Sequence, residues 1–214
     1  MESLWILERL KGLDLLKDRD VWWWPNALSF EVVIGAVLTQ NTKWENVEKS
    51  LQNLKVARIL SDDDEESLHN LALCQSIENH IIASGFYRQK SSRLIALARA
   101  MQSDFGDFGG FCDNVEREWL LLQKGIGFES ADSILNYACG REVMVVDKYS
   151  FRLLQQLGIE IYEYNELQSW FMDLALGDLH RLYKDMPLAQ IYARYHGKIV
   201  EFSKRKMRLE NENL

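Results

Sequence analysis

The sequence predicts an all-α fold, and three observations support that class. Apolar residues recur at spacings of three and four along nearly the whole chain, which is the period of amphipathic helices. The one run rich in β-branched residues, 143–146, has four residues and suits an extended linker. With 47% hydrophobic and 27% charged residues, the composition is that of a folded, soluble protein with a real core.

The apolar pattern predicts helices from Phe30 onward. The apolar residues there fall at i, i+3, i+4, i+7 and i+8, namely Phe30, Val33, Ile34, Val37 and Leu38. The same period continues over 44–54. Further on, Ser61 followed by Asp64 resembles a capping box, so the acidic run 62–66 is predicted to be the solvated first turn of another helix.

Helical periodicity resumes beyond the acidic run. A helix is predicted from Leu94 to Met101, and a glycine-rich break at 105–110 follows it. Further helices are predicted at 115–122, 130–138, 148–157, 166–176 and from 188 to about 207. Helices at opposite chain ends commonly pack together, so a lobe built from both termini is expected.

Length and charge limit the possible functions only loosely. The 214 residues fit one globular unit or two small lobes that share a cleft. The formal net charge is −7, and the acidic run alone contributes five of these negative charges. Net charge therefore argues only weakly against a nucleic-acid partner, because local fields decide that question.

Cysteine usage predicts a reduced, cytoplasmic setting without a metal centre. The three cysteines Cys74, Cys112 and Cys139 form no C-x-x-C pair, so neither a zinc site nor a disulfide framework is indicated. The N-terminus lacks the uninterrupted apolar stretch of a signal peptide. No segment reaches the roughly 18–20 apolar residues that a membrane span needs.

The most informative segment is 122–131, which reads LQKGIGFESA. A predicted helix ends before it, a Gly-x-Gly turn formed by Gly125, Ile126 and Gly127 follows, and a new amphipathic helix begins. Backbone N–H groups at such a helix start bind phosphate without reading base sequence. By itself the turn could equally be a plain tight turn.

An aspartate stands twenty residues beyond Gly127, at the end of the apolar run and the start of the next helix. Alone, Asp147 would be interpreted as a helix N-cap. A Gly-Ile-Gly hairpin and an aspartate at this separation, in an all-helical chain of this length, resemble the helix-hairpin-helix DNA glycosylases, the family that includes endonuclease III.

Other segments support the same resemblance. The helix from Phe30 and the loop Gln40-Asn41-Thr42 are similar to the family's early helix and the loop whose glutamine enters the duplex gap. The segment 85–90, GFYRQK, is similar to its Gly-x-Tyr-x-x-Lys helix start. The resemblance covers about residues 28–155.

The resemblance implies a fold, a partner and a catalytic residue. It implies a two-lobed fold with a cleft between the lobes, a terminal helical lobe of 1–28 with 142–214, and a helical-barrel lobe of 29–141 containing the helix-hairpin-helix at about 115–138. Double-stranded DNA would be the partner of a monomeric protein, and Asp147 would be catalytic. Gln40 and the hairpin residues Gly125, Ile126 and Gly127 would bind DNA.

Two departures from endonuclease III are informative. Glu129 stands where its hairpin has the nucleophilic lysine, so the Schiff-base route to strand cleavage is lost. Lys124 stands on the other side of the turn, where the family usually has proline. No cysteine follows Cys139, so the family's C-terminal iron–sulfur cluster is expected to be absent, and no cofactor or metal is expected.

The aromatic residues indicate which base a monofunctional glycosylase would remove. Three consecutive tryptophans, 22–24, cannot all face one core, so at least one is expected at a surface or pocket. Indole faces attract cations and suit a positively charged alkylated purine. With Trp-Trp-Pro, no lysine and no cluster, the chain resembles the 3-methyladenine DNA glycosylases of the endonuclease III class. That resemblance implies a base pocket lined by Trp23, Trp24, Pro25 and Trp44, with Glu129 a possible rim contact; the alternatives are core aromatics and a surface glutamate.

A mechanism follows from that substrate. Because N3-methylation makes the adenine cationic, the base leaves as a neutral molecule and needs little help from a general acid. Asp147 would stabilise the sugar cation that develops at C1′, or orient the attacking water. The enzyme would extrude the nucleotide, and Gln40 would fill the space left in the duplex.

Basic residues are the candidate phosphate contacts, although charge runs often form only a solvated face. They are Arg88, Lys90, Arg93 and Arg99, and in the tail Lys198, Lys204, Arg205, Lys206 and Arg208. Lys198 lies in an apolar helix and is expected to snorkel, find a carboxylate or be modified. His196 and the other histidines are interpreted as structural or surface residues.

Two alternative functions stay open. One is a bifunctional glycosylase and lyase for oxidised pyrimidines, against which Glu129 and the indoles argue. The other is a helix-hairpin-helix module that binds DNA without catalysis, against which Asp147 and the tryptophans argue, because a phosphate clamp needs neither.

Overall fold

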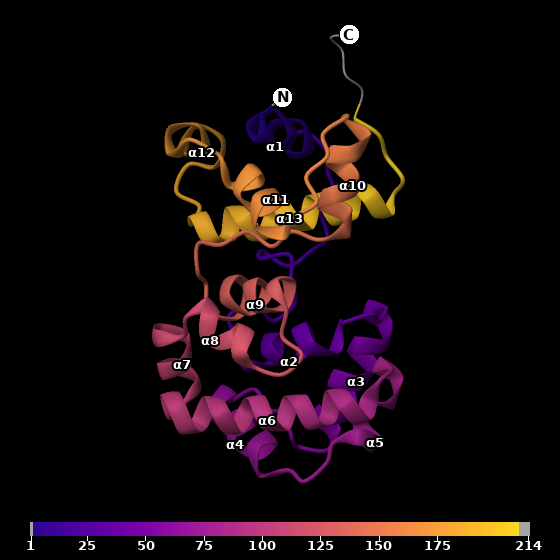
Figure 1. Ribbon diagram of the computed structural model, residues 1–214, viewed down its shortest axis with the longest axis vertical. Helices are drawn as coiled ribbons and strands as arrows, with labels where there is room; N and C mark the ends of the chain where they lie inside the picture. The colour runs from indigo at the N-terminus through magenta and orange to yellow at the C-terminus, as the bar shows by residue number, and fades with distance from the viewer. Residues whose placement is uncertain (1, 210–214) are drawn as a thin grey trace. The chain divides into compact units, whose positions relative to one another are not determined.

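The computed structural model describes residues 2–209, and all the regular secondary structure in that range is helical (Figure 1). No β-strand occurs among these residues, which confirms the predicted fold class. The chain divides into two compact units, a terminal unit of Met1–Pro25 with Gly140–Leu214 and a middle unit of Asn26–Cys139. No helix in the described part of the chain is long and apolar enough to cross a membrane.

The middle unit is built around α2, whose residues 32–38 are all buried. Helices α3, α4, α6 and α9 pack against α2, so the apolar stripe seen in the sequence becomes the centre of this unit. Its elements are α2 (Phe30–Leu38), α3 (Trp44–Val56), α4 (Asp64–Leu73), α5 (Glu78–Ile81), a 3₁₀ turn η1 (Ile82–Ser84), α6 (Tyr87–Phe105), α7 (Phe108–Asn114), α8 (Arg117–Leu122), α9 (Phe128–Ser133) and a π-helical stretch η2 (Ile134–Ala138).

The acidic run begins α4 as predicted, but a different residue caps the helix. The carboxylate of Asp63 accepts the N–H of Glu66 at 2.9 Å, and Asp63 is the N-cap. Ser61, the predicted cap, lies two residues too early, and its hydroxyl donates to the Asp63 carbonyl at 3.1 Å. The prediction failed because any short polar side chain of the run could cap the helix, and local sequence does not choose among them.

The run is the first turn of α4 and is mostly exposed, as predicted, but two of its carboxylates also bind other helices. Asp64 accepts the N–H of Phe30, the first residue of α2, at 2.7 Å. Glu65 accepts the N–H groups of Phe108 and Gly109 at the start of α7, at 2.7 and 3.1 Å. Two carboxylates of α4 therefore cap two other helices, and partial burial raises the pKa of Asp64 although the Phe30 N–H opposes the shift.

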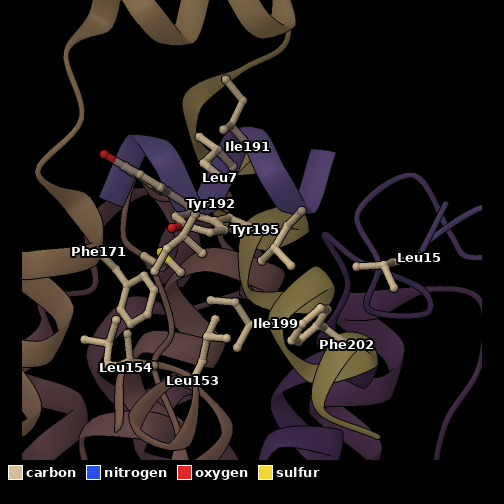
Figure 2. Packing of buried hydrophobic residues seen from close by; sticks show 14 of the residues in the cluster. Leu7, Leu15, Leu153, Leu154, Phe171, Ile191, Tyr192, Tyr195, Ile199 and Phe202 are labelled. Atoms are coloured by element: carbon tan, nitrogen blue, oxygen red, sulfur yellow. The ribbon is translucent and has the colours of Figure 1, made fainter. Parts of the chain in front are cut away.

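The terminal unit joins the two ends of the chain in one core. Its helices are α1 (Ser3–Lys11), α10 (Lys148–Gln156), α11 (Tyr164–Met172), α12 (Leu176–Tyr183) and α13 (Leu188–Lys204). Figure 2 shows Leu7, Leu154, Phe171 and Tyr195 from four of these helices gathered in one apolar cluster. The hydroxyl of Tyr195 donates to the carbonyl of Ser3 at 2.9 Å, which ties α13 to the first turn of α1.

Several helix bounds differ from the expected ones. The segment 143–146 forms neither helix nor strand and links η2 to α10, as expected of a linker. The predicted helix 166–176 instead spans Tyr164–Met172, and a further helix, α12, follows it that the apolar pattern did not separate. Helix α9 begins at Phe128, two residues before the expected start, because Gly127 in extended conformation is its N-cap.

Candidate active site

The backbone places Asp147 at the start of α10, after a buried extended segment that contains Val145 and Val146. Its Oδ1 accepts the N–H groups of Tyr149 and Ser150, at 2.8 and 3.1 Å. The Asp147 N–H in turn donates to the Ser150 hydroxyl at 3.3 Å, which completes a capping box. The N-cap interpretation of Asp147 is therefore right for one carboxylate oxygen and leaves the other, Oδ2, for a second role.

The second oxygen of Asp147 faces a histidine. Nε2 of His196, on α13, lies 3.7 Å from Oδ2. Burial of Asp147 disfavours its charged form, but the nearby His196 imidazole and the N–H groups of Ser150 and Tyr149 favour that form and outweigh burial. The pKa of Asp147 is therefore lowered below its ordinary value. The lowered pKa favours the anionic form of this largely buried carboxylate, the form that stabilises positive charge nearby.

The tryptophan segment of the terminal unit is only partly buried. Trp24 is buried with 9% of its surface exposed, Trp22 and Trp23 are half-buried, and Pro25 is exposed. The rings of Trp23 and Trp24 meet edge to face with centroids 6.2 Å apart. Consecutive indoles thus face different surroundings, as chain geometry requires.

The hairpin of the middle unit has the backbone that the Gly-x-Gly turn predicts. Gly125 has φ +85°, in the left-handed region, and a Cβ there would lie 2.6 Å from Cδ of Arg93. Ile126 is buried beneath the turn, and Gly127 caps α9 with its own backbone exposed. Glu129 is exposed on the first turn of α9.

An ion pair joins the two helices of the hairpin. The guanidinium of Arg117 on α8 donates to both carboxylate oxygens of Asp132 on α9, at 2.7 and 2.8 Å. The Asp132 side chain is fully buried, and the guanidinium also lies 4.8 Å from the ring centroid of Phe128. Such a bidentate pair fixes the angle between the two helices and hence the shape of the turn.

Gln40 lies directly against the hairpin. Its side-chain amide donates to the carbonyl of Gly125 at 2.8 Å and to the hydroxyl of Ser130 at 2.9 Å. The loop after α2 and the Gly-x-Gly turn, which are 85 residues apart, are therefore one connected surface feature. Trp44 follows this loop as the first residue of α3 and is half-buried.

Lys90 was expected among the phosphate contacts, and the structure corrects that expectation. Its side chain is 2% exposed, and Nζ donates to the carbonyls of Leu38, Gln40 and Ser84 at 2.7, 3.0 and 2.7 Å. A fourth contact, at 2.8 Å, is to Oγ1 of Thr42. Lys90 therefore binds the C-terminal end of α2 and the Gln40 loop from inside the protein. The helix dipole favours a cation at that end of α2.

Stability should depend on pH through Lys90. Burial, with the nearby charge of Arg93, lowers the pKa of Lys90 to about 8, against about 10.4 in an unfolded chain. Between these values the unfolded state binds more protons, so the contribution of Lys90 to the unfolding free energy should rise with pH across that window. Urea denaturation of the wild type and of Lys90→Met at about pH 7.5 and 10 measures this contribution. The unfolding free energy of the wild type should exceed that of the variant by more at the higher pH. An unchanged difference would contradict the shift.

Other basic residues are also placed differently from the expectation. Arg99 donates to the carbonyls of Ala72 and Cys74, both at 2.8 Å, and so anchors a turn. Lys198 is 6% exposed, and its Nζ donates to the carbonyl of Leu10 at 3.1 Å, so it neither snorkels nor meets a carboxylate. Burial, with Arg194 and Lys11 nearby, lowers the pKa of Lys198 to about 8.

Exposed cations do occur near the features described. Arg93 packs against Gly125 of the hairpin, and Arg88 is exposed at the start of α6. At the chain's C-terminal end, Lys204, Arg205, Lys206 and Arg208 are exposed. Arg205 also donates to the carbonyl of Leu15 at 3.0 Å, and Arg93 is half-buried. The exposed side chains of Arg88, Lys204, Lys206 and Arg208 are available to phosphates, whereas Lys90 and Lys198 are buried.

Comparison with known proteins decides the family. The model of the HhH-GPD superfamily base excision DNA repair proteins matches residues 34–168, which include the hairpin and Asp147. The chain belongs to the HhH-GPD superfamily. A protein of Methanocaldococcus jannaschii, provisionally named a DNA repair glycosylase, is 36% identical over 195 residues, which are 86% of this chain and 80% of that relative. The chain is a DNA glycosylase of this superfamily with DNA as its partner.

Solved structures agree with the superfamily. The crystal structure of the H. pylori 3-methyladenine DNA glycosylase MagIII, bound to 1,N6-ethenoadenine, superposes with a TM-score of 0.95. It is 55% identical, with 98% of this chain and 100% of that chain covered. A trapped endonuclease III–DNA covalent intermediate shares the fold, with a TM-score of 0.62 at 17% identity over 92% of this chain and 83% of that one.

The predicted site residues divide between the two units. Asp147, Trp23, Trp24, Pro25 and Lys204 belong to the terminal unit. The middle unit contains Gln40, Trp44, Gly125, Ile126, Gly127 and Glu129. Within the middle unit Gln40 and Gly125 are in contact. No group of three or more His, Cys, Asp or Glu side chains suited to a metal ion occurs among residues 2–209.

Sequence reasoning for this superfamily member missed two residues beside the site. His196 was interpreted as structural or surface, yet it is buried against Asp147, 49 residues away in sequence. The only sequence signal is its position in the apolar stripe of α13, where a histidine needs a polar partner. Arg117 was not singled out, although it joins the two helices of the hairpin.

Proposed function

We propose that the protein is a monofunctional glycosylase that removes alkylated purines, with 3-methyladenine preferred, by hydrolysis of the N-glycosidic bond. The observation that supports this most is Asp147, a largely buried carboxylate with a lowered pKa at the start of α10. The 55% identity to the H. pylori 3-methyladenine DNA glycosylase supports the choice of base.

Release of 3-methyladenine needs an anion beside the sugar more than it needs a general acid at the base. In 3-methyladenine nucleotides the base is cationic, so the glycosidic electron pair leaves with it and neutral 3-methyladenine departs. Positive charge then develops at C1′ of the sugar, and a fixed carboxylate stabilises it. Water adds to C1′ and gives up its proton to the carboxylate or to solvent. Asp147 can serve in both steps without being protonated at the start.

Base recognition is assigned to aromatic side chains. Trp23, Trp24, Pro25 and Trp44 are the proposed pocket, and Glu129 is a proposed polar contact at its rim. Trp23 and Trp44 are half-buried, so each keeps part of its indole surface accessible. An electron-rich ring binds a cationic purine more strongly than a neutral one, which gives selectivity for methylated bases.

DNA binding is assigned to the hairpin and the loop beside it. The exposed backbone of Gly125 and Gly127 would bind phosphate, with Ile126 buried beneath as their support. Gln40 would occupy the gap left by the extruded nucleotide, and Lys204 would contact the backbone. We propose no iron–sulfur cluster, no other cofactor and no metal.

The protein is expected to release bases without cutting DNA. Incubation with methylated duplex DNA, followed by chromatography of the released bases and a separate strand-break assay without alkali, tests this. Release of 3-methyladenine with intact strands is the expected result, because Glu129 offers no amine for a Schiff base. Strand scission without alkali would contradict the monofunctional proposal. DNA binding with no base released would favour a non-catalytic module.

A further inference from the structure

His196 lies between the proposed catalytic carboxylate and a proposed pocket indole. Its ring is buried on α13, with Nε2 3.7 Å from Oδ2 of Asp147. The same ring meets Trp23 edge to face, with centroids 5.2 Å apart at 78°. All three side chains belong to the terminal unit, so this contact chain is internal to one compact body.

The Trp23 side of this contact is built tightly. Trp23 has φ +71°, a left-handed conformation that costs about 1 kcal/mol or more in a bulky residue. Its indole lies over Gly197, where a Cβ would collide with the ring. The residue beside His196 must therefore be small for the indole to reach the histidine, and the contacts around Trp23 must offset the cost of its left-handed backbone.

The Asp147 side explains why a histidine is needed. Oδ1 is already occupied by the Tyr149 and Ser150 N–H groups of its own helix, so those donors fix one oxygen only. Oδ2 is the oxygen that remains to face charge or water. His196, from another helix, faces this oxygen at 3.7 Å, and an apolar residue there would put a hydrophobic side chain where the imidazole now lies beside Oδ2.

We propose that His196 is a positioning residue: it orients Oδ2 of Asp147 and couples the placement of this oxygen to that of the Trp23 indole. The proposal rests on the proposed function, because it gives Asp147 the role assigned above. A bound base that displaces Trp23 would also shift Asp147, because the His196 ring contacts both residues. Base recognition and cleavage would thus depend on the same side chain.

The test compares three substitutions of His196 with a matched control. Gln places its amide near the position of Nε2, Asn places it near Nδ1, and Leu has no donor. His180→Leu is the control, since His180 is an exposed histidine of the same unit. Each variant is assayed for the single-turnover release of 3-methyladenine and, separately, for affinity to duplex DNA with an abasic-site analogue.

We expect His196→Leu to slow base release on the order of 10²-fold, as for a misplaced catalytic group, with DNA affinity within about twofold. Gln should restore more of the rate than Asn, and His180→Leu should match the wild type. Equal rates for Gln and Asn, or a Leu variant as fast as the wild type, would overturn the proposal. Should the Leu variant not fold, the Gln and Asn pair still decides it.

A second readout separates this proposal from the proposed function. NMR titration of the carboxyl carbon of Asp147 needs no activity, and the pKa of Asp147 should rise in His196→Leu relative to the wild type. A protein that releases no base but shows this shift would overturn the proposed function while supporting the contact. A protein that releases 3-methyladenine but shows no shift would overturn the role of His196 alone.

Discussion

Asp147→Asn is expected to abolish release of 3-methyladenine while leaving DNA binding intact. The substitution removes the negative charge that stabilises the developing sugar cation and keeps the size of the side chain. Loss of one such electrostatic group costs about 10²–10³-fold or more in rate. Single-turnover release from methylated duplex DNA measures the loss, and a filter-binding or anisotropy titration measures the affinity.

The structure offers a control for the fold at the same position. Oδ1 of Asp147 caps α10, and asparagine caps helices about as well as aspartate, so Asp147→Asn should keep the cap and lose only the stability that comes from the charge. Alanine loses the cap as well and should lower the unfolding free energy by about 1 kcal/mol. An asparagine variant that releases base within tenfold of the wild-type rate would remove Asp147 from the mechanism.

Periodicity was sufficient to predict the helices because burial selects the same spacing that the backbone needs. The stripe from Phe30 became the buried centre of the middle unit, and the extended 143–146 stayed a linker. The contacts of the acidic run with distant helices could not be predicted from local sequence. Asp64 and Glu65 cap helices that begin 34 residues earlier and 43 residues later, and only folding brings those N–H groups to them.

Prediction of the site was limited in the same way, because contacts between distant residues leave no local signal. Asp147 and the Gly-x-Gly turn have local signals, a helix start after an apolar run and two glycines between helices, so their places in the fold could be predicted. The partner of Asp147 could not, since His196 approaches it from 49 residues away. Lys90 was misassigned for the same reason, because the carbonyls it binds, such as that of Leu38, are on another helix.

Arg117→Met is expected to destabilise the protein more than any surface substitution. Methionine keeps most of the volume of the side chain but leaves the fully buried carboxylate of Asp132 without its guanidinium partner. Breaking a buried pair from one side typically costs about 3–5 kcal/mol, a large part of the roughly 5–15 kcal/mol that a domain has. Urea or thermal denaturation followed by circular dichroism measures the loss.

The double variant Arg117→Met/Asp132→Leu tests the physical reason. Replacing both partners by apolar residues removes the stranded charge, so much of the lost stability should return. Glu118→Ala, on the exposed face of the same helix, should change stability by no more than about 0.5 kcal/mol. If the double variant is as unstable as Arg117→Met, packing rather than charge holds α8 to α9. If it is stable but binds duplex DNA weakly, the pair's importance lies in setting the helix angle that shapes the Gly125–Gly127 turn.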